Sequence, residues 1–265
     1  IWAIEATVAK TTSPDSNKKE FNPAIFHITN LIFHLLNTIL VFVILRILIK
    51  DELACFFCAL LFALHPVQVE SVAWVTGLRG VLSGFFSLIA IWQYLLYAKL
   101  SMASSEGAEI DQDYKKRKTL HYVMAIFSFL LATLSKPNAV TLPLVTCMLD
   151  YFILKRQPRQ ILISLIGFMA IGLPMLGVTL YFQHFNPAPS LHLSFFDRLL
   201  VVTDTLAFYL YKIFLPFSLG PDYGRTPKFV LSQKLVYVAW MIPVLFLIIT
   251  YKIKKHRPWL LASAA

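Results

Sequence analysis

The sequence predicts an all-α protein: a polytopic transmembrane helical bundle with about eight to nine hydrophobic segments. Of its 265 residues, 58% are hydrophobic and 14% are charged, whereas a soluble domain carries about 25% charged residues. The mean hydropathy is +0.68. The apolar runs are continuous and lack the alternation of a membrane β-barrel, which favours helices. We therefore expect a single integral membrane domain over residues 1–265.

The apolar runs follow one another with short polar turns between them, and several approach the roughly 20 residues that cross a bilayer. Prolines near their ends or centres predict helix ends or kinks. The runs are 25–49, 53–66, 79–98, 120–135, 139–154, 160–182, 199–216 and 235–251, with a ninth from 258.

The orientation of the helices follows from clusters of Lys and Arg, which collect on the cytoplasmic side. Three clusters, at 46–50, 99–118 and 155–159, are separated by two crossings each. The opposite face then receives 1–24, 67–78, 136–138 and 184–198. A fourth cluster at 252–257 fits only if 199–216, with Asp204 and Lys212, is re-entrant or lies along the interface. This distribution explains the net charge of +10 without nucleic acid as a partner.

One face of the first helix carries four polar residues, which fall within about an 80° wedge at helical spacing. Such groups are costly against lipid, so we expect them to face the bundle interior or a wet cavity. They either bond neighbouring helices or, for the outer pair His27 and Asn30, bind a substrate. The other two members of the wedge are His34 and Asn37.

The second apolar run ends at Pro66, and the chain emerges from it on the outer face as the segment 65–74. It places His65 and the carboxylate Glu70 five residues apart. Glu70 lies between apolar residues near the bilayer surface, where desolvation suits a carboxylate to proton transfer. The alternative is a solvated Glu70 beside Trp74 as an interfacial anchor.

Two cations on the same outer face depart from the positive-inside trend. Lys136 lies in the turn 135–138, and Arg79 precedes a helix rich in small residues. A phosphate group is a natural partner for such cations, and the alternative for Lys136 is snorkelling to lipid headgroups. Asp150, at the other end of the following helix, is expected to pair with Lys155 or Arg156.

Two remaining features carry less information. The turn 221–225 contains Asp222 and Tyr223, which contact a polar substrate if this turn is on the outer side and are otherwise solvated. Cys55 and Cys58 lie within an apolar run, where they fill space rather than bind a metal. We expect no metal site.

Three motifs follow one another in an order and spacing shared with a known family. They are His27-x-x-Asn30-x-x-x-His34-x-x-Asn37, then Phe62-Ala63-Leu64-His65-Pro66-x-x-x-Glu70-x-Val72-Ala73-Trp74, then Leu134-Ser135-Lys136-Pro137 with Thr141-Leu142-Pro143 and Asp150-Tyr151. The chain resembles the membrane domain of the transmembrane, tetratricopeptide-coupled protein O-mannosyltransferases, which are GT-C glycosyltransferases. The resemblance covers residues 22–155 and, more weakly, 195–227.

This resemblance implies a glycosyltransferase that uses a polyprenyl-phosphate mannose donor and a protein acceptor with Ser or Thr hydroxyls. The donor phosphate would lie near Lys136 and Arg79, and a carboxylate would take the proton of the attacking hydroxyl. Cations would stabilise the leaving phosphate. The site would lie on the non-cytoplasmic face of a bacterial inner membrane, our first choice, or of the endoplasmic reticulum.

The chain departs from the family pattern in two ways. The principal acidic motif of the family lies in the first outer loop, which we expect upstream of residue 1, with Glu5 as a remnant. A first transmembrane helix and C-terminal tetratricopeptide repeats are also expected outside the chain. The family usually follows Gly77 with Arg, a polar residue and Asp, whereas this chain has Leu78, Arg79 and Gly80. A non-catalytic membrane scaffold and a lipid or solute transporter therefore remain as alternative functions.

Overall fold

The computed structural model describes residues 23–105, 111–185, 193–220 and 223–253. All elements in these ranges are helical. Five helical stretches are long and apolar enough to cross a membrane, and two shorter apolar helices, Glu52–Leu64 and Val236–Ile249, accompany them. The five are Pro23–Leu48, Leu78–Ser104, Gln112–Ser135, Pro137–Leu154 and Pro158–Phe182. The prediction of an all-α integral membrane protein is thus confirmed, and the count of eight to nine segments stays a prediction.

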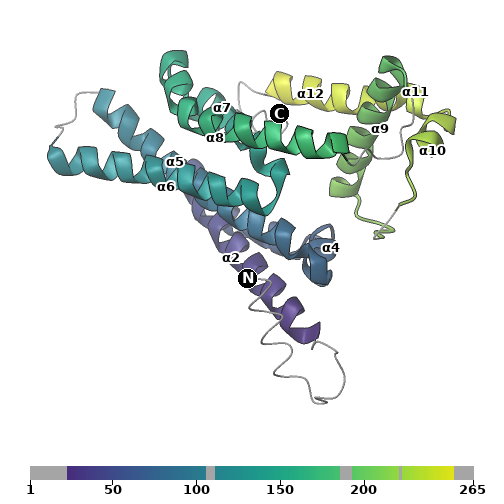
Figure 1. The fold of residues 1–265 in the computed structure, drawn as a ribbon, viewed down its shortest axis with the longest axis horizontal. Helices are drawn as coiled ribbons and strands as arrows, with labels where there is room; N and C mark the ends of the chain where they lie inside the picture. Colours follow the sequence, from purple (N-terminus) through teal and green to yellow (C-terminus); the bar gives the residue numbers. More distant parts are fainter. Residues whose placement is uncertain (1–22, 106–110, 186–192, 221–222, 254–265) are drawn as a thin grey trace. The chain divides into compact units, whose positions relative to one another are not determined.

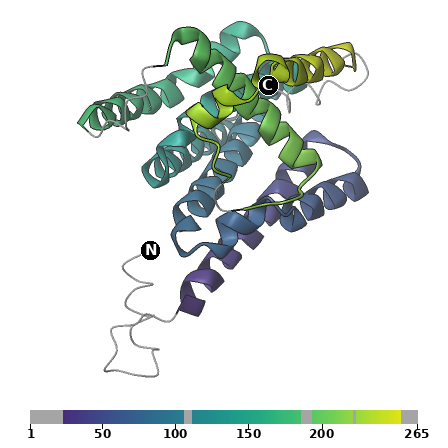
Figure 2. The same cartoon turned by 90° about the vertical axis from the view of Figure 1, so that its right-hand side faces the viewer.

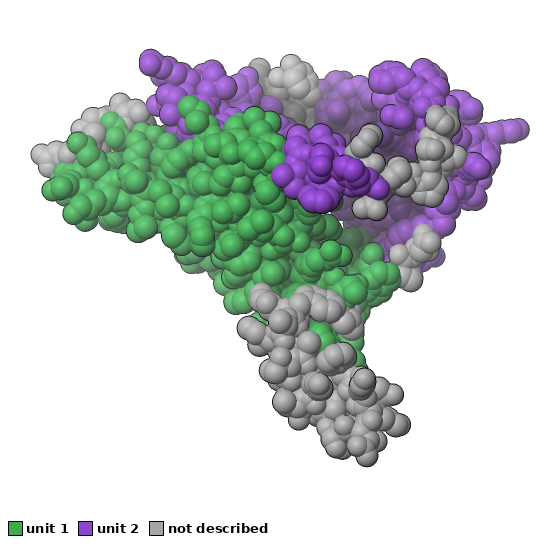
Figure 3. All heavy atoms as spheres, viewed as in Figure 1, with its two compact units in different colours: residues 1–143, 166–175 green, residues 144–165, 176–265 purple. Residues whose placement is uncertain are grey.

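The chain divides into two compact units, which are described separately (Figure 3). Unit 1 comprises residues 1–143 and 166–175, and unit 2 comprises residues 144–165 and 176–265. The boundaries fall inside two helices, α7 (Leu142–Met148) and α8 (Pro158–Phe185). The central part of α8 therefore belongs to unit 1. Whether the membrane region is one domain stays a prediction.

Unit 1 begins with α2 (Pro23–Leu48) and α3 (Glu52–Leu64), joined by a tight turn. The Asp51 side chain starts α3 by accepting hydrogen bonds from the amides of Leu53 (3.0 Å) and Ala54 (3.1 Å), as N-cap residues do. Figure 2 shows α3 folded back beside the second half of α2. Many apolar side chains of α2, such as Leu35, remain exposed, as expected for a surface against lipid.

The next elements of unit 1 are the short helix α4 (Gln68–Ala73), the 3₁₀ turn η1 (Val75–Gly77), α5 (Leu78–Ser105), α6 (Gln112–Ser135) and the 3₁₀ turn η2 (Pro137–Thr141). Helices α5 and α6 lie side by side (Figure 1). The Phe168 ring of α8 is fully buried against the rings of Tyr94 and Phe129, with centroids 5.6 and 5.2 Å away. This aromatic packing joins the middle of α8 to the α5–α6 pair.

Unit 2 contains the π-helical turn η3 (Leu149–Leu154), α9 (Phe195–Phe214), α10 (Pro227–Ser232), α11 (Val236–Ala239) and α12 (Met241–Ile253). A capping box between Ser194 and Asp197 starts α9. Helix α9 is not among the membrane-length apolar helices, and it buries Asp204 and Lys212. Its predicted re-entrant or interfacial position stays a prediction.

Candidate functional site

The segment between α3 and α5 is a folded-back connection, and its start is fixed by His65 and Pro66. The amide of Val67 donates to Nδ1 of His65 (3.2 Å), and the amide of Gln68 donates to the His65 carbonyl (2.9 Å). These bonds end α3 and begin α4 within three residues. Helix α4 therefore presents Glu70 six residues after Leu64, the last residue of the apolar helix α3.

A close backbone approach at Gly77 turns the chain from α4 into α5. A Cβ atom built on Gly77 would lie 2.3 Å from the carbonyl oxygen of Ser71, a distance that no side chain tolerates. Glycine therefore allows η1 to pack against α4. The result is that Glu70, Ser71 and Arg79 lie around one hollow despite the intervening turn.

The turn after α6 contributes Lys136 to the same hollow. The Ser83 hydroxyl of α5 donates to the carbonyl of Ala132 (3.0 Å), which ties the end of α6 to the first turns of α5. Pro137 then starts η2. A Cβ atom on Gly80 would lie 4.0 Å from Nζ of Lys136, so the lysine side chain lies close to the backbone of α5.

The hollow has a volume of about 390 Å³ and is walled by α4, η1, the start of α5 and the turn before η2. It contains two cations, Arg79 and Lys136, and one carboxylate, Glu70, which leaves an excess of one positive charge. All three side chains are exposed, and no salt bridge joins any of them within the described residues. The other lining residues are Ser71, Trp74, Thr76, Gly77, Gly80, Ser135, Pro137 and Asn138.

The polar stripe of α2 holds this region together from the inside. Asn30 is fully buried and donates from Nδ2 to the carbonyls of Val72 (3.2 Å) and Trp74 (2.7 Å), at the end of α4. Its amide hydrogens are thus used within the protein, while Oδ1 has no hydrogen-bond partner. In the structure, Asn30 joins α2 to the end of α4 through hydrogen bonds. Its contact with a substrate stays a prediction.

His34 and Asn37 act in the same way on two other elements. Nε2 of His34 lies 3.0 Å from the carbonyl of Ala63 at the end of α3. Nδ2 of Asn37 donates to the carbonyl of Val81 in α5 (3.1 Å). These contacts agree with the alternative in which His34 and Asn37 form hydrogen bonds to neighbouring helices.

The two histidines of the predicted site lie in a different hollow. His27 and His65 line a largely apolar space of about 440 Å³ between α2, α3 and α4. Helix α4 contributes to both hollows: Val69 lines the hollow of the histidines, and Glu70 lines the charged hollow. The structure thus divides the predicted set into a charged group of three and a histidine pair.

Two further predicted site residues, Asp222 and Tyr223, belong to unit 2. Tyr223 packs its ring edge-to-face on Phe208, with centroids 5.0 Å apart, and Nζ of Lys212 lies 5.1 Å from the Tyr223 ring centroid. Asp222 and Glu5 lie outside the described residues. The substrate contact of Asp222 and Tyr223 stays a prediction.

Comparison with known proteins gives sequence relatives, while no family model and no solved structure matches. The chain is 26% identical over 148 residues to mouse Protein O-mannosyl-transferase TMTC3, covering 56% of the chain and 15% of that protein. It is 38% identical over 74 residues to human Protein O-mannosyl-transferase TMTC1 (28% of the chain, 8% of that protein). It is 25% identical over 225 residues to human Protein O-mannosyl-transferase TMTC2 (77% of the chain, 26% of that protein).

The chain is a distant homologue of the TMTC protein O-mannosyltransferases. The homology extends over much of the chain and confirms the resemblance read from the three motifs. The chain spans between 8 and 26% of the lengths of these three relatives. The activity of the full-length relatives is therefore only a proposal for this chain.

The structure of this TMTC homologue gives the departure at Gly80 a physical meaning. An aspartate at that position would hold its carboxylate beside Nζ of Lys136, because even a Cβ atom there would be 4.0 Å away. With glycine, Lys136 faces the hollow without that partner.

Thr76 and Asn138 also line the charged hollow, although the sequence analysis did not single out Thr76 and included Asn138 only as part of the turn 135–138. Both lie in the short turns that begin and end on the predicted outer face. Membership of those turns was the available signal for them.

Proposed function

We propose that this chain forms the membrane part of a GT-C glycosyltransferase that transfers mannose from a polyprenyl-phosphate donor to Ser or Thr hydroxyls of proteins. The observation that carries this proposal is the hollow in which Arg79, Lys136 and Glu70 converge. An excess positive charge beside a carboxylate suits a phosphate leaving group next to an attacking hydroxyl. The distant TMTC homologues add support, because their names state protein O-mannosyl transfer.

The reaction is a single displacement at the anomeric carbon. The acceptor hydroxyl oxygen forms a bond to carbon one as the bond from carbon one to the phosphate oxygen breaks. A carboxylate takes the hydroxyl proton, and polyprenyl phosphate leaves with the bonding electron pair and inversion at carbon one. Arg79 and Lys136 stabilise the charge that develops on the phosphate. Glu70 is the carboxylate that lines this hollow, and it is therefore the group of this chain that we expect to take the proton.

The proposed site opens on the non-cytoplasmic face, either periplasmic or lumenal, and eight to nine segments form the membrane region. A membrane scaffold without catalysis is the second candidate. The observation that favours it is Gly80, which leaves the hollow without the carboxylate usual in the family.

The test is transfer of radiolabelled mannose from polyprenyl-phosphate mannose to a Ser/Thr-containing peptide by the full-length protein in membranes. Lys136→Ala is expected to lower the rate by about 100-fold, as removal of a transition-state donor does, and Glu70→Gln is also expected to lower it. Lys115→Ala is the matched control, because Lys115 is an exposed lysine in the first turn of α6 and should leave the rate unchanged.

If Lys136→Ala and Glu70→Gln both keep the full rate of mannose transfer, the reaction does not take place in this hollow. Absence of transfer to peptide, glycan and lipid acceptors by the full-length protein would reject the enzyme and leave the scaffold.

A further inference from the structure

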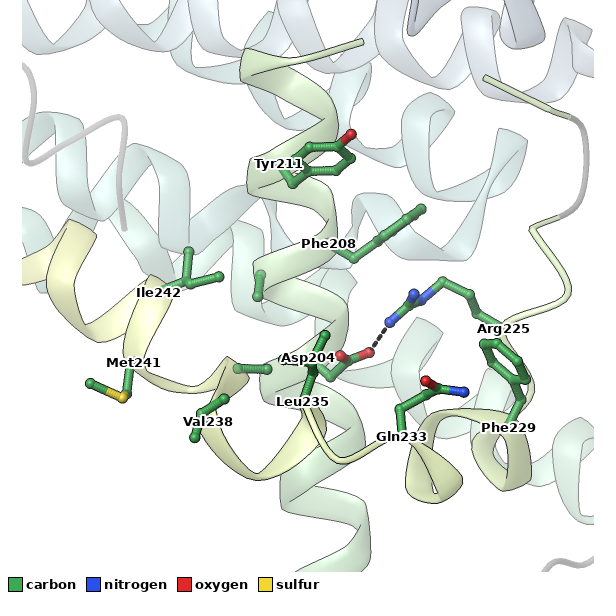
Figure 4. A pocket seen from close by; sticks show the side chains of 12 residues that line it. Asp204, Phe208, Tyr211, Arg225, Phe229, Gln233, Leu235, Val238, Met241 and Ile242 are labelled. Atoms are coloured by element: carbon green, nitrogen blue, oxygen red, sulfur yellow. Dashed lines mark hydrogen bonds and ion pairs between the residues drawn. The ribbon is translucent and has the colours of Figure 1, made fainter. Parts of the chain in front are cut away.

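Unit 2 contains a second hollow of about 610 Å³ with mainly apolar walls (Figure 4). It lies between α9, α10, α11 and α12, and its apolar walls include Phe208, Phe229, Val238 and Ile242. Hollows of roughly 300–1,000 Å³ with apolar walls and a few polar groups are typical of small-molecule sites. The size and lining of this hollow therefore suit a ligand with a large apolar body.

Besides the Tyr211 hydroxyl, the polar groups of this hollow are Asp204, Arg225 and Gln233, and these three lie near one another in Figure 4. Arg225 and Asp204 form an ion pair, and the guanidinium of Arg225 lies 4.5 Å from the ring centroid of Phe208. Both paired side chains keep some exposure, 30% for Arg225 and 12% for Asp204. The pair can therefore still donate a hydrogen bond through Arg225 and accept one through Asp204.

The charge of this polar end is balanced, unlike that of the hollow in unit 1. The neighbouring cation Lys212 is not a lining residue, and its Nζ donates to the carbonyls of Phe217 and Ser218. An anionic head would therefore compete with Asp204 for Arg225. A hydroxyl both donates and accepts, so it satisfies the two partners without adding charge, and a buried hydroxyl needs such bonds.

We propose that this hollow binds an uncharged membrane amphiphile, a long-chain alcohol, with its hydroxyl on the Asp204–Arg225 pair and its chain along α11 and α12. This site is separate from the charged hollow of unit 1 and does not depend on the proposed glycosyl transfer. It adds a binding site for a neutral lipid in unit 2.

The experiment uses the full-length protein in lipid nanodiscs with two photoreactive probes that share one chain, a diazirine-bearing hexadecanol and a diazirine-bearing hexadecanoate. After irradiation, mass spectrometry maps the labelled peptides. The alcohol is expected to label 204–242 in preference to the lipid-exposed surface of α2, and excess unlabelled hexadecanol should suppress that labelling. The carboxylate should label 204–242 several-fold less.

Two substitutions on one helix separate filling of the hollow from a general change of α12. Ile242 lines the hollow and Leu245 does not, and both are exposed apolar residues, at 52 and 57%. Ile242→Trp is expected to reduce the alcohol labelling several-fold, while Leu245→Trp leaves it unchanged. Asp204→Asn leaves Arg225 without its carboxylate, so the preference should shift toward the carboxylate probe.

Three results would overturn the proposal: labelling of 204–242 no stronger than that of α2, equal or stronger labelling by the carboxylate, or equal labelling of the Ile242→Trp and Leu245→Trp proteins. If Asp204→Asn fails to fold, the tryptophan pair still decides. None of these results depends on mannose transfer, so a failure here is distinct from a failure of the proposed enzyme.

Discussion

One group of charged side chains in unit 1 and two ion pairs in unit 2 differ in whether they have partners within the protein. In unit 2, Asp150 pairs with Arg156 at 2.8 Å, and both side chains are buried, at 0 and 1% exposure. Arg156 also donates to the hydroxyl of Ser164 (3.2 Å). Asp204 pairs with Arg225. These four charged side chains of unit 2 are thus committed to contacts within the protein.

In unit 1, the charged residues on the predicted outer face are not committed in this way. Glu70, Arg79 and Lys136 line one hollow, are exposed, and form no salt bridge within the described part of the chain. Exposed charges without partners inside the protein cost little free energy at the membrane surface, because water solvates them. They also remain available to a ligand. The buried Asp150–Arg156 pair therefore serves stability, whereas the three exposed charges of the unit 1 hollow are candidates for function.

The largest effect on stability is expected from Asp150→Asn, which leaves the Arg156 guanidinium buried without its carboxylate. Removal of one partner from a buried pair costs about 3–5 kcal/mol. The measurement is the thermal midpoint of the purified protein in detergent. Glu52→Gln is the matched control, because the Arg46–Glu52 pair is exposed at 52 and 70%, and such pairs contribute about 0–1 kcal/mol.

The thermal midpoint of Lys136→Ala, in unit 1, should be measured in the same way and compared with that of Asp150→Asn. The midpoint of Lys136→Ala should equal that of the unmodified protein even though mannose transfer falls. A midpoint as low as that of Asp150→Asn would end the distinction between the two units.

An intermediate effect is expected from Gly77→Ala. The added Cβ atom would meet the Ser71 carbonyl at 2.3 Å, so α4 or η1 must shift, at a cost of about 1–3 kcal/mol. Both the thermal midpoint and the rate of mannose transfer should fall, because the shift moves Glu70 relative to Arg79. Gly177→Ala is the control, since a Cβ atom there meets nothing within 4 Å. Equal behaviour of the two variants would show that the turn tolerates relaxation.

The smallest effect is expected from Gly80→Asp, which places a carboxylate beside Lys136. The new pair is partly exposed and therefore contributes roughly 1 kcal/mol or less, about a fivefold rise in the KM of the donor. High salt should reduce the difference. A lower KM or a higher kcat would instead show that the carboxylate at this position takes part in the reaction.

Much of the fold could be predicted from local sequence. Continuous apolar runs identified the helices, Pro66 marked a helix end, and Asp150 was expected to pair with Lys155 or Arg156. The pair forms with Arg156, while Lys155 adopts a left-handed backbone (φ 53°) that ends η3. These features depend on residues close together in the chain, which is why the sequence was sufficient.

The site was only partly predictable because its geometry depends on contacts between distant residues. The grouping of Glu70, Arg79 and Lys136 needs the Ser83–Ala132 bond and the tight turn at Gly77. The separation of His65 from Glu70 by α4 was not apparent from their spacing of five residues. The pairing of Asp204 with Arg225 crosses 21 residues, and no local pattern indicates it.

The polar stripe of α2 has a consequence for the order in which the chain enters the membrane. Asn30, His34 and Asn37 bond carbonyl groups that lie 29 to 44 residues later. During synthesis from the N-terminus, α2 therefore meets the bilayer before its partners exist, and polar groups without partners are costly there. The apolar length of α2 favours its insertion in any case, so we expect α3, α4 and α5 to relieve this cost as they dock on α2 and thereby to favour early association of these four helices.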